Sequence, residues 1–154
     1  MDPSYEMTRN WLLESGICVS NSSDQNHGGV HSFFDEKKNE FAFLYPEITG
    51  YFISTMRFLY EHEKNEKFVK LAKASSNWII QLYEKHGGII QGISTQGVPQ
   101  KLAYSFDTGI CSKGLLDCFA ITKEQKFLEY AKKLNPVSYT HLRAHETRHD
   151  LVCR

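Results

Sequence analysis

Two acidic residues near the starts of expected helices are the side chains of this chain best suited to chemistry. Glu47 follows Pro46, a residue suited to the first helical turn, and Asp107 opens a later helix. Two carboxyl groups at one mouth can serve as general acid and general base. Each also has a structural alternative. A carboxylate in a first turn gains about 0.3–1 kcal/mol from the helix dipole, and Asp107 is well placed as an N-cap.

Four further residues are candidates in the same segments. Tyr51 lies one turn beyond Glu47, where its hydroxyl could move a proton or its ring could stack on a ligand, so we count it as a third candidate catalytic residue. The alternative for Tyr51 is an aromatic of the core. His31, Asp35 and Tyr104 are candidate substrate-binding residues of long loops, although His31 and Asp35 could equally be plain exposed residues.

The end of the chain offers a metal-ligand pattern that we set aside. His141, His145 and His149 follow one another at intervals of four, which would place them on one helical face. Residues 137–154, however, resemble the translation of a transposase-type sequencing adapter, and the match covers this whole segment. We therefore expect an artefactual tail outside the fold, a natural protein that continues beyond Pro136, and neither a metal site nor a cofactor.

Composition argues against several classes of partner. Without the tail's three arginines and two acidic residues, the 18 lysines and arginines become 15 and the 18 acidic residues become 16. A net charge near −1 predicts no binding to nucleic acid or an anionic membrane, and no apolar stretch approaches the ~20 residues of a membrane span. Three scattered cysteines (18, 111 and 118) and the lack of a signal peptide predict a cytoplasmic protein.

A repeat of 59 residues predicts the architecture. The landmark pairs are Gly28-Gly29 with Gly87-Gly88, Thr49-Gly50 with Thr108-Gly109, and Phe68/Ala72 with Phe127/Ala131. Three pairs at one offset indicate repeated units, each of which buries its apolar face against a neighbour. The glycines that follow Thr49 and Thr108, Gly50 and Gly109, are expected to permit close helix packing.

Helical periodicity dominates the units, and the connections alternate in length. Apolar residues recur at helical spacing between residues 68 and 82, and helices are also expected before residue 16, from residue 46, from 107 or 108 to 122, and after it. The connections within pairs are short, whereas residues 16–45 and 87–106 form long ones. Alternate connections of stacked helical hairpins emerge on opposite faces, so both long loops should meet on one face, the default site.

The motifs resemble those of a known group of folds. Trp11-Leu-Leu, the loop Gly28-Gly29-Val30, Tyr45-Pro-Glu-Ile-Thr-Gly-Tyr51 and Phe106-Asp-Thr-Gly109 look like repeat units of alpha/alpha-toroid, six-hairpin glycosidase-like proteins. The group includes uronyl hydrolases, polysaccharide lyases and sugar epimerases, and two of the motifs resemble members associated with surface-polysaccharide biosynthesis. The resemblance implies an all-α fold in which residues 1–136 form two repeats of a partial toroid.

The resemblance also implies a carbohydrate-active protein. A glycoside hydrolase, lyase or epimerase-like enzyme would bind a saccharide, namely a polysaccharide or a uronyl or amino sugar, with Glu47 and Asp107 at the floor of the mouth. A non-catalytic glycan-binding or scaffold toroid stays open as an alternative. A toroid acting on isoprenoids or peptides also stays open, although the acidic cluster or Cys/His zinc set that it needs is not seen before Pro136.

Overall fold

The fold is described by a computed structural model, which covers residues 2–100 and 102–135. The helices are α1 (Pro3–Glu14), α2 (Pro46–Glu63), α3 (Glu66–His86), α4 (Ser105–Thr122) and a last helix over residues 125–135. The expected all-α class is confirmed. The expected artefactual segment, 137–154, lies outside the described residues.

Local sequence signals explain where the first hairpin begins, turns and ends. Pro46 opens α2, and Lys64 ends it in a left-handed conformation at φ 55°. Asn65 then caps α3, because its side chain accepts a hydrogen bond from the N–H of Lys67. Gly87 closes α3 at φ 71°, a conformation that glycine adopts without steric cost. The two helices can therefore fold back on each other over a connection of two residues.

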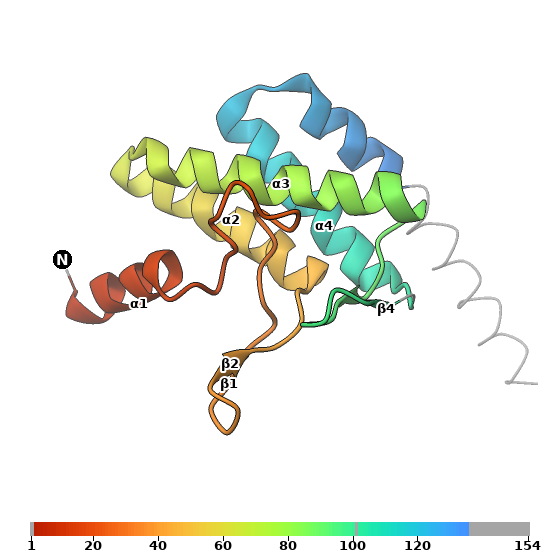
Figure 1. Ribbon diagram of the computed structural model, residues 1–154. Coiled ribbons are helices and arrows are strands. Elements are labelled where there is room, and N and C mark those ends of the chain that lie inside the picture. Colours follow the sequence, from red (N-terminus) through yellow and green to blue (C-terminus); the bar gives the residue numbers. More distant parts are fainter. Residues whose placement is uncertain (1, 101, 136–154) are drawn as a thin grey trace, which may run out of the picture.

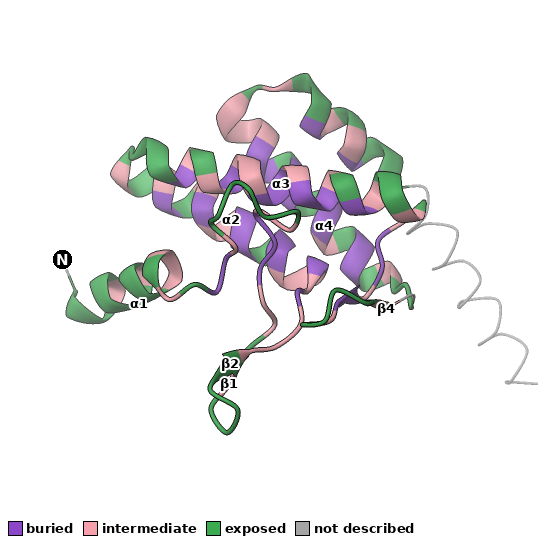
Figure 2. Ribbon diagram, in the orientation of Figure 1, coloured by how far each residue is buried: buried purple, intermediate pink, exposed green. Residues whose placement is uncertain are grey.

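The core lies where α2, α3 and α4 meet. In Figure 1, α3 crosses in front of α2 and α4, and the helix over residues 125–135 folds back beside α4. Figure 2 shows the buried residues of these helices turned towards one another. The largest fully buried side chains include Trp78, Phe68 and Phe127, which belong to the expected apolar stripes. Burial of such aromatic rings is a main source of stability for a helical domain.

Glycine allows α2 and α4 to cross at close range. A Cβ atom on Gly50 would lie 2.8 Å from the carbonyl oxygen of Ile110, and one on Gly114 would lie 2.9 Å from the carbonyl oxygen of Gly50. The expected role of Gly50 in close packing is thus confirmed. The same expectation is wrong for Gly109 within the described chain, because a Cβ there would meet nothing within 4 Å. The α2 glycine is packed and its repeat counterpart in α4 is open.

The two long loops lie side by side, as the repeat predicts. Leu44 and Ile93 exchange backbone hydrogen bonds of 2.8 and 3.0 Å, one residue from each loop. The loops also hold two short antiparallel hairpins that the sequence did not predict. These are β1 (Phe34–Asp35) with β2 (Glu40–Phe41), and β3 (Gly92–Ile93) with β4 (Pro99–Gln100).

Helix α1 is attached to the rest of the described chain by polar contacts with α2 and by the partly buried side chains of Tyr5 and Leu13. It contains no buried residue, and the guanidinium of Arg9 pairs with Glu63 at 3.1 Å while the hydroxyl of Tyr5 donates to the same carboxylate at 2.8 Å. Because α1 contributes no fully buried side chain to the core, it is held less firmly than α2 to α4. Within the described chain, no helix combines the length and apolar character that a membrane crossing requires.

Candidate active site

The structure brings Glu47 and Asp107 together at the starts of α2 and α4. Glu47 is the second residue of α2, as expected for a residue of the first turn. Asp107 is the third residue of α4, and the N-cap position belongs to Tyr104, which makes no side-chain capping bond. The N-cap alternative for Asp107 is therefore wrong, because the helix begins at Ser105, before the start at residue 107 or 108 that the sequence suggested. Its carboxyl group is turned into the protein instead.

Asp107 is buried in a way that favours its neutral form. The residue is 3% exposed, and its Oδ2 atom has no hydrogen-bond partner among the described residues. Burial and the nearby charge of Glu47 raise the pKa of Asp107, while the Tyr45 hydroxyl and the backbone N–H of Asp107 act in the opposite direction. The dipole of α4 favours the anion by only about 0.3–1 kcal/mol. A carboxyl group with a raised pKa is suited to proton donation.

Tyr45 completes the cluster, and the sequence did not single it out as a site residue. It stands at the N-cap position of α2. Burial, followed by the carboxyl groups of Glu47 and Asp107, raises the pKa of its hydroxyl. The hydroxyl therefore stays protonated and is available to donate to either carboxylate. One signal could have found it: Tyr45 and Tyr104 are separated by the same 59 residues as the other landmarks.

Cys111 lies beneath the acid pair and is not a nucleophile. Its thiol is fully buried and donates to the carbonyl oxygen of Pro46 at 3.3 Å. Burial, together with the charges of Asp107 and Glu47, raises the pKa of Cys111 well above its usual value. A neutral, inaccessible thiol is a packing group, so the reactive groups of this site are the oxygens.

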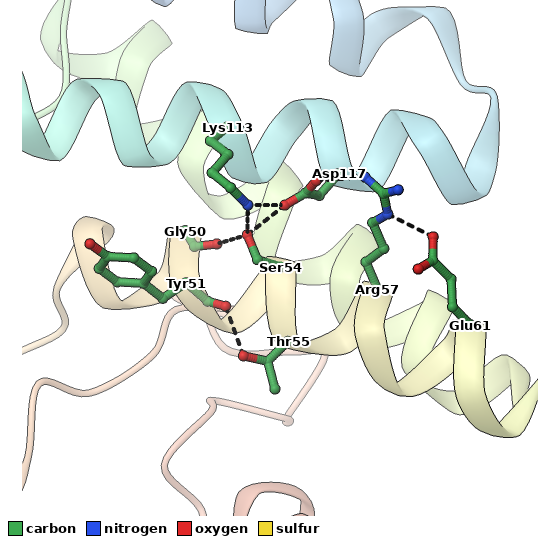
Figure 3. Close-up of polar contacts among 8 residues, drawn as sticks. All are labelled: Gly50, Tyr51, Ser54, Thr55, Arg57, Glu61, Lys113 and Asp117. Carbon is green, nitrogen blue, oxygen red and sulfur yellow. Dashed lines mark hydrogen bonds and ion pairs between the residues drawn. The ribbon is translucent and has the colours of Figure 1, made fainter.

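Tyr51 and Tyr104 are exposed and stand apart from the polar contacts that join α2 to α4. Tyr51 is 43% exposed and Tyr104 is 47% exposed, so the core alternative for Tyr51 is wrong. Figure 3 shows the Tyr51 ring pointing away from the contacts made by Lys113. An exposed ring beside Glu47 on the same helix is free to meet a ligand.

A polar network fixes the crossing of α2 and α4 beyond the acid pair. Asp117 accepts from Ser54 at 2.5 Å, from Lys113 at 2.7 Å and from Arg57 at 2.9 Å (Figure 3). Burial alone would raise the pKa of Asp117, but the hydrogen bonds from Lys113, Ser54 and Arg57 outweigh it and lower the pKa. The network sets the relative position of the two helices whose first turns carry Glu47 and Asp107.

The structure does not bring His31 and Asp35 to the acid pair by any contact. The Nδ1 atom of His31 lies 2.6 Å from the carbonyl oxygen of Ala42, and its ring stacks on Phe41. Asp35 sits in the β1–β2 hairpin, which extends away from the helices in Figure 1. Its carboxylate accepts the backbone N–H groups of the next turn, at residues 37 and 38. Asp35 therefore has a local structural role in shaping this turn.

Tyr45, Glu47 and Asp107 form a cluster of ionisable oxygen groups at the first turns of α2 and α4. The Asp107 carboxyl group is biased towards its neutral form and interacts electrostatically with Glu47, and the Tyr45 hydroxyl interacts with both acids. Two neighbouring carboxyl groups, one of them with a raised pKa, are suited to general acid–base chemistry. Among residues 2–100 and 102–135, no group of three or more His, Cys, Asp or Glu side chains is arranged to hold a metal ion.

Comparison with known proteins gives a likeness in fold. The structure is similar to that of a GH76 alpha-mannanase from Bacteroides thetaiotaomicron, with a TM-score of 0.59 and 19% sequence identity. The likeness covers 86% of this chain and 37% of that chain, so the chain spans well under half of its neighbour. No family model matches the sequence, and no curated protein matches it either. The likeness supports the helical-toroid expectation for the fold.

Proposed function

We propose that this chain belongs to a carbohydrate-active enzyme of the glycoside hydrolase, lyase or epimerase kind, acting on a saccharide at the first turns of α2 and α4, where the two long loops end. Asp107 is the general acid and Glu47 the general base or nucleophile. Tyr45 positions the pair. The observation that carries the proposal is the buried Asp107 carboxyl group, whose pKa is raised beside Glu47.

The likeness in fold to an alpha-mannanase supports the choice of substrate class. The geometry supports the choice of roles. Departure of a sugar leaving group needs a proton donor, and the second carboxyl group must be ionised to activate water, to attack the sugar or to remove a ring proton. Tyr51, exposed on the same helix as Glu47, offers a ring for stacking on the sugar.

The proposal is tested by isosteric substitution in the protein expressed from its native gene. Glu47→Gln and Asp107→Asn keep the shape of each side chain and remove its ionisable group, so each should lower kcat on a polysaccharide substrate by about 10²–10⁴-fold. Tyr45→Phe should raise the pKa of Asp107 and move the basic limb of the pH–rate profile upwards, because the hydroxyl lowers that pKa.

Matched controls come from α2 itself. Glu61→Gln and Tyr60→Phe make the same chemical changes elsewhere on the helix, where Glu61 pairs with Arg57 and the Tyr60 hydroxyl lies 3.5 Å from Glu66, and both should leave kcat unchanged. Full activity of both acid variants on the substrate would show that the acids are structural. Retained saccharide binding with no turnover in the unmodified protein would favour the non-catalytic glycan-binding alternative.

A further inference from the structure

A second site lies where the two long loops meet. A pocket of about 390 Å³ opens between residues of the first loop and the β3–β4 turn, and neither Glu47 nor Asp107 lines it. Its volume is in the range of small-molecule sites, about 300–1,000 Å³. The polar side chains on which the ligand class is argued are those of Asp24, Gln25, Asn26, His31, Ser94 and Gln96.

The imidazole of His31 is held in one orientation and one tautomer. A carbonyl oxygen only accepts hydrogen bonds, so the 2.6 Å contact with Ala42 requires that Nδ1 carries the hydrogen. In the neutral ring, Nε2 is then an acceptor. The ring also stacks on Phe41 at a centroid distance of 5.1 Å and an angle of 22°. The pocket therefore presents a fixed acceptor that needs no reordering when a hydroxyl group binds.

Two more polar groups are fixed by backbone contacts. The Oδ1 atom of Asp24 accepts from the N–H of Asn26 at 2.7 Å, which leaves Oδ2 as a second acceptor. The Oγ atom of Ser94 accepts from the N–H of Val98 at 3.0 Å, which leaves its hydrogen free to donate. Together with His31, these groups form a preorganised set of acceptors and a donor.

Three side-chain amides complete the lining. Gln25, Asn26 and Gln96 each offer two N–H donors and one carbonyl acceptor, and none of these amides is hydrogen-bonded to another residue in the part of the chain that the structure describes. Hydrogen-bond donors and acceptors placed around one cavity match a ligand whose groups can both donate and accept, as hydroxyl groups can.

The charge of the lining separates neutral from anionic ligands. Neither Lys nor Arg is among the lining residues, and Asp24 is the only residue with a formal charge there. The adjoining pocket, which shares Asp24 and Gln25, carries Lys70 and Lys73 instead. A carboxylate, sulfate or phosphate group bound in the pocket between the two loops would lie near the negative charge of Asp24 without a compensating cation.

We propose that this pocket binds a neutral sugar unit through its hydroxyl groups, apart from the acid pair. The ligand class rests on the proposed carbohydrate-directed function. The site itself rests on the fixed imidazole, carboxylate and hydroxyl and on the three free amides. It would hold a saccharide chain at the loop face while the acids act elsewhere on it.

The test is a titration of the full chain with methyl α-D-mannopyranoside, methyl α-D-glucopyranoside and mannotriose, followed by NMR. The side-chain NH₂ signals of Gln25, Asn26 and Gln96 should shift and saturate with at least one of these ligands. Glucuronate, which has the same ring and one negative charge, should bind more weakly than the glucopyranoside. No saturable shift with any of the three neutral ligands, or tighter binding of glucuronate, overturns the proposal.

Variants assign the binding to this pocket. His31→Phe keeps the stacked ring and removes Nε2, and Gln96→Ala removes one amide, so each should weaken binding by about fivefold to tenfold, the value of one hydrogen bond. Gln81→Ala is the matched control, because Gln81 lines the two adjoining pockets and not this one. Unchanged affinity in both His31→Phe and Gln96→Ala overturns the proposal.

Glu47→Gln separates this inference from the proposed function. It removes an ionisable group of the acid pair and should leave the affinity of the loop pocket unchanged. Saturable binding at the pocket with no turnover in any assay would contradict the proposed enzymatic function and leave the pocket proposal standing. Loss of turnover in Glu47→Gln, combined with no binding at the pocket, would contradict the pocket proposal and support the proposed enzymatic function.

Discussion

The first turns of α2 and α4 are built from the same signals and differ in what surrounds them. Each helix follows a tyrosine at the N-cap position, and Thr49 and Thr108 donate their hydroxyls to the carbonyl oxygens of these tyrosines at 2.9 and 3.0 Å. A repeated sequence thus gives a repeated local structure. Only Thr49 also accepts a backbone N–H, that of Val30 at 3.1 Å. The difference lies in the neighbour, because α2 packs on α4 at Gly50, while a Cβ atom on Gly109 would meet nothing within 4 Å.

The glycines that follow these threonines offer the largest test of this comparison. Gly50→Ala would place a Cβ atom 2.8 Å from a backbone oxygen of α4, and such overpacking should lower the free energy of unfolding by about 1–3 kcal/mol. Gly109→Ala has open space and replaces a helical glycine, so it should raise the free energy of unfolding by about 0.5–1 kcal/mol. Urea unfolding followed by circular dichroism measures both. Equal effects of the two substitutions would show that the helices do not cross at Gly50.

The threonines provide a second, smaller test. Thr49→Val keeps the shape of the side chain and leaves the buried N–H of Val30 without its partner, which should cost about 1–3 kcal/mol. Thr108→Val removes one hydrogen bond to a carbonyl that still accepts the backbone N–H of residue 108, so about 1 kcal/mol or less is expected. The same urea experiment applies. A larger loss at Thr108 would contradict the assignment of Thr49 as the link between loop and helix.

These differences mark what the sequence could predict. Helix type, the start of α2 at Pro46 and the meeting of the long loops follow from periodicity, proline chemistry and the 59-residue repeat, which are local or repeated signals. The dipeptide Asn-Trp, which occurs at residues 10–11 and again at 77–78, shows the limit of prediction from such local signals. Trp78 is 1% exposed in the core, whereas Trp11 is 48% exposed, because burial depends on neighbours that a short motif does not encode.

The candidate site shows the same limit. The sequence identified Glu47 and Asp107 from their positions at expected helix starts, and the structure joins them through the packing of α2 on α4. Tyr45 was missed because an N-cap tyrosine has no capping side chain and so gives no local signal. For Asp35 the sequence could not separate two roles, because a carboxylate that shapes a turn and one that binds a ligand look the same in sequence.

The two aspartates of α4 give the finest test, because their environments push their pKa values apart. The hydrogen bonds from Lys113, Ser54 and Arg57 hold the pKa of Asp117 below the usual value for an aspartate. The stability that this carboxylate contributes is therefore present above about pH 4 and is lost as the pH falls through its folded-state pKa. The pKa of Asp107 is raised above the usual value for an aspartate, so its contribution to stability depends on pH in the opposite sense. It is fully present below about pH 4 and is lost as the pH rises through the folded-state value.

Carbon-detected NMR of the side-chain carboxyl groups measures both titrations, and Glu47→Gln sharpens the test. The negative charge of Glu47 is a cause of the raised pKa of Asp107, whereas the pKa of Asp117 is set by burial and by Lys113, Ser54 and Arg57. The substitution should therefore lower the midpoint of Asp107 and leave that of Asp117 in place. Each unit of pKa corresponds to about 1.4 kcal/mol of interaction between the groups, so even a shift of a fraction of a unit reports their proximity. An unchanged pKa of Asp107 in Glu47→Gln would show that the two carboxyl groups do not interact, and would remove the basis for a shared catalytic site.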